Sequence, residues 1–159
     1  MRANVRTRRC AGVTLIELVV VIILLGILSA VAVPRMTDTS SFDKVVFRDS
    51  LAATLRYAQK TAISHRRLTC VRIETQRASI AMAAAHGSTA CTAALPGPDG
   101  KPDIRAKDVT TSVTPTRTVY FQPNGDITED PAGATHWNAV LTVAGANSIQ
   151  IAGATGYVQ

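Results

Sequence analysis

One carboxylate near the start of a membrane-length apolar run constrains this chain more than any other feature. Four positions interrupt the apolar residues from 13 to 33, namely Thr14, Glu17, Gly26 and Ser29. At about 1.5 Å per residue this run would form a helix roughly 32 Å long, close to the thickness of a bilayer's hydrocarbon core. A charged side chain in such a helix costs about 2.5–3.5 kcal/mol. We therefore expect Glu17 to have a partner of opposite charge.

The residues ahead of this run are basic. Four arginines lie in the first 12 residues, Arg2, Arg6, Arg8 and Arg9. Positive charge beside a membrane helix keeps that flank in the cytoplasm. The sequence therefore predicts a cytoplasmic N-terminus, with the C-terminal part of the chain on the other side of the membrane.

A glycine directly before the apolar run completes a recognisable pattern. Gly12 is followed by Val13-Thr14-Leu15-Ile16-Glu17, and the run closes on Pro34. This arrangement resembles the class III leader of type IV pilins and pseudopilins. The resemblance implies that prepilin peptidase cleaves between Gly12 and Val13, and that the new N-terminus at Val13 is methylated.

The resemblance also supplies the partner that Glu17 requires. In filaments of this family the equivalent glutamate is thought to pair with the N-terminal amine of a neighbouring subunit, which here would be Val13. A buried carboxylate and a buried ammonium are each costly alone, and pairing offsets much of both costs. Such an assembly salt bridge would set the register between subunits. The family usually has Phe, Met or Leu where this chain has the apolar Val13.

Two other interpretations of the N-terminal segment are open. Ala30-Val31-Ala32 fits the cleavage site of a secretory signal peptide, but the apolar run exceeds the roughly 7–15 residues usual in such peptides. A plain single-pass anchor would explain neither Gly12 nor Glu17. The pilin-type interpretation accounts for both residues, and we adopt it.

These features divide the chain into three segments. We expect a cleaved leader over 1–12, a transmembrane and assembly helix over 13–34, and a periplasmic globular domain over 35–159. The resemblance implies prepilin peptidase, other pilin or pseudopilin subunits, inner-membrane lipid and assembly-platform proteins as partners. The protein would lie in the bacterial inner membrane before it enters a filament.

Removal of the leader changes both the charge and the cysteine count. The net charge falls from +6 to +2 because four arginines leave, so the basic pI is weak evidence for nucleic-acid binding. Cys10 also leaves, and Cys70 and Cys91 remain as an even pair in an oxidising compartment. We expect a Cys70–Cys91 disulfide, with two free thiols as the alternative. Neither cysteine has a zinc-ligand neighbour at the usual spacing.

Helical periodicity continues after the apolar run. A second helical segment is expected to begin near Ser40 or Ser41, as the continuation of one long helix bent at Pro34. Its apolar stripe consists of Phe47, Leu51, Leu55, Ala58 and Ala62. Its polar residues Arg48, Arg56, Gln59 and Lys60 fall mostly on the opposite side.

Strand patterns follow this helix. A hairpin is expected over 68–74 and 78–84, and further strands over 118–122, 136–143, 148–152 and around 157–158. Glycine, proline and charged residues predict a long surface loop over 86–116. A helix followed by antiparallel strands is an α+β arrangement.

Short segments of this domain are similar to GspH/FimT-type minor pilins and pseudopilins. They are Arg56–Ile63, Tyr120–Gly125, and Ser148–Ile151 followed by Thr155–Val158. The residues after the apolar run are also similar to those of mannose-sensitive haemagglutinin-type minor pilins. The resemblance implies a type IV pilin-like fold, in which a long N-terminal helix packs its amphipathic half on an antiparallel β-sheet.

The sequence offers little catalytic chemistry. It contains no glycine-rich phosphate loop, nucleophile elbow or zinc-spaced cluster. Its three histidines, His65, His86 and His136, are isolated along the chain. We expect no enzymatic activity, no cofactor and no metal. A calcium site on Asp99, Asp103 and Asp108 is the open alternative.

The leading prediction is a minor pilin or minor pseudopilin. Such a structural subunit would prime or tip the assembly of a type IV pilus or a type II secretion pseudopilus, and the sequence does not separate the two systems. The alternative is a DNA-binding minor pilin for natural DNA uptake, since some FimT-type proteins bind DNA. Its nucleic-acid patch would consist of Arg66, Arg67, Arg72 and Arg77.

Overall fold

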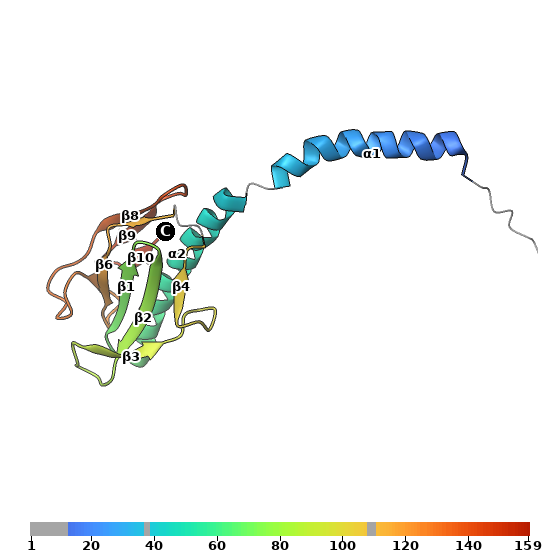
Figure 1. Cartoon of the computed structure of the whole chain (residues 1–159). Coiled ribbons are helices and arrows are strands. Elements are labelled where there is room, and N and C mark those ends of the chain that lie inside the picture. Colours follow the sequence, from blue (N-terminus) through green and yellow to red (C-terminus); the bar gives the residue numbers. More distant parts are fainter. Residues whose placement is uncertain (1–12, 37–38, 108–110) are drawn as a thin grey trace, which may run out of the picture. The chain divides into compact units, whose positions relative to one another are not determined.

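The computed structural model describes residues 13–36, 39–107 and 111–159 (Figure 1). The chain divides into two compact units, Met1–Asp38 and Thr39–Gln159, and each is described by itself. The predicted leader and Gly12 lie outside the described residues.

The described part of the first unit is one helix, α1 (Leu15–Met36). Its large apolar side chains from Leu15 to Leu28 are exposed, from Val19 at 36% to Leu15 at 80%. No helix in the described part of the chain is both long enough and apolar enough to cross a membrane. The transmembrane segment expected over 13–34 therefore stays a prediction.

The second unit begins with α2 (Thr39–His65). The predicted apolar stripe is confirmed, because Phe47, Leu51, Leu55, Ala58 and Ala62 are each at most 3% exposed. One detail differs from prediction, because Ser40 and Ser41 lie within the first turn of α2 rather than ahead of it. The residues between the end of α1 at Met36 and the start of α2 at Thr39 lie outside the described part of the chain, so one long helix bent at Pro34 stays a prediction.

An arginine in a left-handed conformation ends α2. Arg66 has a φ of 52°, its N–H donates to the carbonyl of Ile63, and the N–H of Arg67 donates to the carbonyl of Ala62. This is the hydrogen-bond pattern of a Schellman motif, in which glycine is usual at the left-handed position. The chain then turns directly into the first strand.

Two antiparallel sheets follow α2. The first has the strand order β3-β2-β1-β6-β7, with β4 also paired to β2. Its strands are β1 (Thr69–Glu74), β2 (Arg77–Ala83), β3 (Cys91–Leu95), β4 (Asp103–Arg105), β6 (Arg117–Phe121) and β7 (Ile127–Thr128). The second has the order β10-β9-β8-β5, from β5 (Val113–Thr114), β8 (Ala139–Val143), β9 (Ile149–Ala152) and β10 (Tyr157–Val158).

The core lies between α2 and the strands. Leu51 and Leu55 of α2 share one buried cluster with Val71 of β1, Phe121 of β6 and Leu141 of β8. α2 contacts β1, β2, β4 and β6 of the first sheet and β10 of the second (Figure 1). The predicted α+β arrangement of a helix packed on antiparallel strands is confirmed, with the strands divided between two sheets.

The prediction of one long loop over 86–116 is wrong. Three short strands lie in this segment, because β3 and β4 pair with β2 while β5 pairs with β8. These strands are only two to five residues long, too short for a clear alternation of apolar and polar side chains, so pairing to distant strands determines their conformation. The sequence analysis also missed β7, and β8 begins at Ala139 instead of residue 136.

Candidate assembly site

The N-terminal end of α1 is closed by the side chain of Thr14. Thr14 Oγ1 accepts a hydrogen bond from the N–H of Glu17 at 3.3 Å, and the carbonyl of Thr14 accepts the N–H of Leu18 at 3.2 Å. Thr14 is thus the N-cap, and Glu17 lies in the first turn, where negative charge suits the helix dipole. The Thr-x-x-Glu spacing of a capping box could have predicted this role.

The side chains at the start of α1 are exposed and pack against no other part of the first unit that the structure describes. Val13 is 72% exposed and Ile16 is 68% exposed, and Glu17 is exposed as well. The hydroxyl of Ser29 donates to the carbonyl of Leu25 at 2.6 Å, so this polar group needs no external partner. A contiguous apolar surface of this extent is typical of a surface that lipid or another protein covers.

The hydrogen bond that Glu17 makes in the described part of the chain uses its backbone N–H. Its carboxylate is therefore available to a group on another molecule. Cleavage at Gly12 and methylation of Val13 are not tested by this geometry, and the pairing of Glu17 with a neighbour's amine remains a prediction.

The second unit contains the predicted disulfide. Cys70 lies on β1 and Cys91 begins β3, and the two are joined across a sequence separation of 21 with Cα atoms 6.1 Å apart. Because β3 is an edge strand, the bridge attaches the edge of the first sheet to its interior strand β1.

The four candidate nucleic-acid arginines fall into two pairs. Arg66 and Arg67 directly follow the end of α2, whereas Arg72 and Arg77 lie on the β1–β2 hairpin. Arg77 Nε lies 2.6 Å from Asp103 Oδ2. Arg72 Nε lies 3.9 Å from Glu74 Oε1. Both hairpin arginines thus have acidic neighbours, and the DNA-binding alternative stays an untested prediction.

The other candidate residues contribute to local structure. Asp103 Oδ2 also lies 2.7 Å from Arg105 Nε, and Asp99 lies 3.7 Å from the ammonium of Lys101. Across the described ranges no group of three or more His, Cys, Asp or Glu side chains could hold a metal ion. Asp108 lies outside the described residues, and His65 and His86 are exposed.

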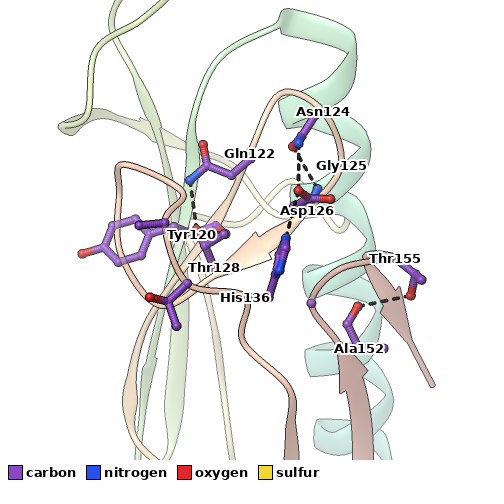
Figure 2. A network of polar contacts seen from close by, with 12 residues as sticks. Tyr120, Gln122, Asn124, Gly125, Asp126, Thr128, His136, Ala152 and Thr155 are labelled. Atoms are coloured by element: carbon purple, nitrogen blue, oxygen red, sulfur yellow. Dashed lines mark hydrogen bonds and ion pairs between the residues drawn. The ribbon is translucent and has the colours of Figure 1, made fainter.

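A turn between β6 and β7 joins polar side chains that the sequence analysis did not connect (Figure 2). Asn124 Nδ2 donates to Asp126 Oδ2 at 2.8 Å, and His136 Nε2 lies 3.2 Å from the same oxygen. Gln122 Nε2 donates to Thr128 Oγ1 at 2.9 Å. His136 therefore helps to hold the approach to β8 against this turn.

Asp130 closes the next loop. Its two carboxylate oxygens accept the N–H groups of Ala134 at 3.1 Å and Thr135 at 2.9 Å. These backbone hydrogen bonds, that from Ala134 first, hold the pKa of Asp130 below its usual value. The Asp130 side chain thus holds this loop by hydrogen bonds to backbone N–H groups, as the Asn124 side chain does in the preceding turn by accepting the N–H of Asp126.

Comparisons with known proteins bear on both units. Residues 7–33 match the family model described as the prokaryotic N-terminal methylation motif. A stretch of 54 residues, 34% of this chain, is 44% identical to the "Type IV narrow pilus major component PilA5" of Thermus thermophilus. That match spans 47% of the relative's length.

The fold has solved counterparts. One crystal form of the type IV minor pilin FimU of Pseudomonas aeruginosa matches with a TM-score of 0.50 and 17% identity, over 72% of this chain and 84% of FimU. A second crystal form of FimU matches with a TM-score of 0.48 and 16% identity, over 72% of this chain and 89% of FimU. At this identity the likeness shows the fold.

The chain therefore combines a prokaryotic N-terminal methylation motif over residues 7–33 with a type IV pilin-like fold of α2 and the strands. The expected resemblance to this family is confirmed. The pilin-like protein also has the expected disulfide, from Cys70 to Cys91.

Proposed function

We propose that this pilin-like protein is a minor pilin, a structural subunit that primes or tips the assembly of a type IV pilus. One observation carries the proposal: the N-terminal methylation motif over 7–33 leads into an exposed apolar helix whose first turn contains Glu17, and a pilin-like domain follows. Both named relatives are type IV pilus proteins, which favours a pilus over a secretion pseudopilus.

In this proposal prepilin peptidase cuts between Gly12 and Val13, and Val13 carries the new, methylated amine. The apolar residues of α1 first contact inner-membrane lipid and later contact other subunits, while the second unit lies in the periplasm. Assembly-platform proteins move the subunit from the membrane into the filament. Each step uses binding and positioning rather than catalysis by this chain.

Glu17 is the residue that links these steps. Its carboxylate would pair with the Val13 amine of the adjacent subunit when α1 enters a filament of packed helices. Leaving either charge unpaired in that apolar environment would cost several kcal/mol, on the order of 3–5, so subunits that are out of register are disfavoured.

The test replaces Glu17 with Ala and with Gln in cells that assemble the filament. We expect both variants to be processed and to remain in the membrane fraction, while their amount in sheared filaments falls at least about tenfold. Glu74→Ala, which removes a carboxylate from the solvent side of β1, is the matched control and should be incorporated normally.

Two outcomes would count against the proposal. Normal incorporation of Glu17→Ala would contradict the role of the salt bridge, and absence of the wild-type chain from sheared pili would contradict the pilus assignment. Recovery with secretion-system pseudopilins instead would assign it to that system.

A further inference from the structure

One face of the first sheet points away from the α2 core. β1 presents Cys70, Arg72 and Glu74 on this face, alternating with the buried Val71 and Ile73. The neighbouring strands are in register with it: Ala81 and Tyr120 lie opposite Cys70, and Ser79 and Thr118 lie opposite Arg72. Directly opposed side chains in antiparallel strands have Cβ atoms about 4.5–5.5 Å apart.

This face is hollowed. A hollow of about 360 Å³ is lined by Arg72, Ser79, Thr89, Thr118 and Tyr120 beside the disulfide. A second hollow of about 480 Å³, lined also by Thr116 and Arg117, shares Arg72 and Thr118 with the first. We name the two together the outer groove. It runs along β1 from the disulfide toward the turn at Thr75.

The disulfide forms one end of the outer groove. Cys70 is 7% exposed and packs with Leu68 and Ala83, with Cys91 and Tyr120 against them, apart from the main core cluster. The bridge therefore stabilises the loop that carries Thr89 and Ala90 at the groove's edge, rather than the packing of α2.

The chemistry of the lining is specific in two respects. The Arg72 side chain is 70% exposed and its contact with Glu74 is long, at 3.9 Å, so its guanidinium can bind a second carboxylate. The four hydroxyls of Ser79, Thr89, Thr118 and Tyr120 can each donate and accept hydrogen bonds. The lining also contains Glu74 and Arg117, and Arg117 Nη2 lies 3.1 Å from Glu129 Oε2, so Arg72 is the arginine with the longer contact to a carboxylate. This loosely paired cation among hydroxyls matches a ligand that carries a carboxylate and many hydroxyl groups.

We propose that the outer groove binds an acidic saccharide of the uronate type. The sugar carboxylate pairs with Arg72, and the sugar hydroxyls exchange hydrogen bonds with Ser79 and Thr118 on the adjacent strands. This binding activity goes beyond the filament role and does not depend on it, since the groove lies wholly within the second unit.

The experiment is isothermal titration of the full chain, in detergent micelles, with trigalacturonate and with its neutral methyl ester. We expect trigalacturonate to bind and the ester to bind at least about tenfold more weakly, because only the free acid forms the charge-assisted pair. Arg72→Gln should weaken trigalacturonate binding by a similar factor. Lys60→Gln removes an exposed cation of α2 and should leave it unchanged.

A conservative pair of variants tests the hydroxyls separately. Ser79→Ala and Thr118→Val should each weaken binding by about three- to tenfold. Trp137 fluorescence identifies any variant that fails to fold, since Trp137 is 2% exposed in the native core. The proposal is overturned if wild type gives no heat with trigalacturonate, if the ester binds equally well, or if Arg72→Gln binds like wild type.

Discussion

Several polar side chains in this protein form hydrogen bonds with backbone groups from distant parts of the sequence. Arg48 of α2 donates to the carbonyls of Asn147 and Ser148 at 3.3 and 3.2 Å. Arg56 Nε donates to the carbonyl of Val158 at 3.0 Å. From sequence these arginines belong to a polar helix face, and the structure shows that they attach α2 to the C-terminal strands. Such residues have structural roles that composition alone does not reveal.

Asp130 provides a pH-dependent test at this scale. Its folded pKa lies below the ordinary 3.8 because the carboxylate accepts backbone N–H groups. The ionised form therefore stabilises the fold above the unfolded pKa, and this contribution is lost as pH falls through the folded pKa. We expect Asp130→Asn to lower Tm at pH 7 and to approach wild type below about pH 4. A Tm difference that stays constant down to pH 3 would contradict this account.

At the scale of elements, α2 differs sharply between its two sides. Phe47 is 3% exposed in the core, whereas Phe42, five residues earlier in the same helix, is 70% exposed. The same side chain therefore contributes very differently to stability at the two positions. Burial in α2 follows the 3.6-residue period, which is why its stripe could be predicted.

This contrast yields a matched pair of substitutions. Phe47→Ala should lower the free energy of unfolding by about 3–5 kcal/mol through lost burial and a residual cavity. Phe42→Ala should change it by no more than about 0.5 kcal/mol. Urea unfolding followed by Trp137 fluorescence measures both. Similar losses for the two variants would show that Phe42 is also buried in the native protein.

The disulfide also acts at the scale of elements, because it attaches the edge strand β3 to β1. Replacing Cys70 and Cys91 together with Ala should destabilise the second unit by about 3 kcal/mol on the loop-entropy model. The measurement is urea unfolding of the variant beside oxidised and reduced wild type. Reduced wild type should behave like the variant, and an unchanged midpoint in both would mean that the bridge adds no stability.

At the scale of the whole molecule, the two units differ in how their apolar side chains are covered. α1 exposes apolar side chains that need a lipid or protein environment, and the second unit has a core of its own. The proposed processing would change the balance, since the mature chain would have a net charge of +2 in place of +6. Residues 1–12 therefore supply most of the net positive charge of the full sequence.

Mass spectrometry of the purified protein tests the processing step. We expect a mature chain that starts at Val13 and carries one added methyl group. Gly12→Val should retain the full 159 residues, because a side chain at that position blocks the cut that the family motif requires. Gly87→Ala, a glycine change in a distant loop, is the control and should be processed normally. An unprocessed wild-type chain would contradict the leader assignment.

Local patterns predicted a large part of this molecule. The N-terminal motif, the buried stripe of α2 and the β1–β2 hairpin follow from spacing within short segments. β3, β4, β5 and β7 did not, because strands of two to five residues carry almost no periodicity of their own. The capping role of Thr14 was visible in the sequence as Thr-x-x-Glu and was overlooked.

The sequence by itself determined the N-terminal motif, because that motif depends on residue type and order near one point of the chain. It also predicted the pairing of Cys70 with Cys91, because these two cysteines remain once the expected leader with Cys10 is removed. Only the tertiary structure decided which acid neutralises Arg77, which carbonyls Arg48 and Arg56 bind, and that Arg72, Ser79 and Thr118 line one groove. Those contacts join positions far apart in the sequence. Strand register and helix packing bring them together, and neither is encoded within a short window of residues.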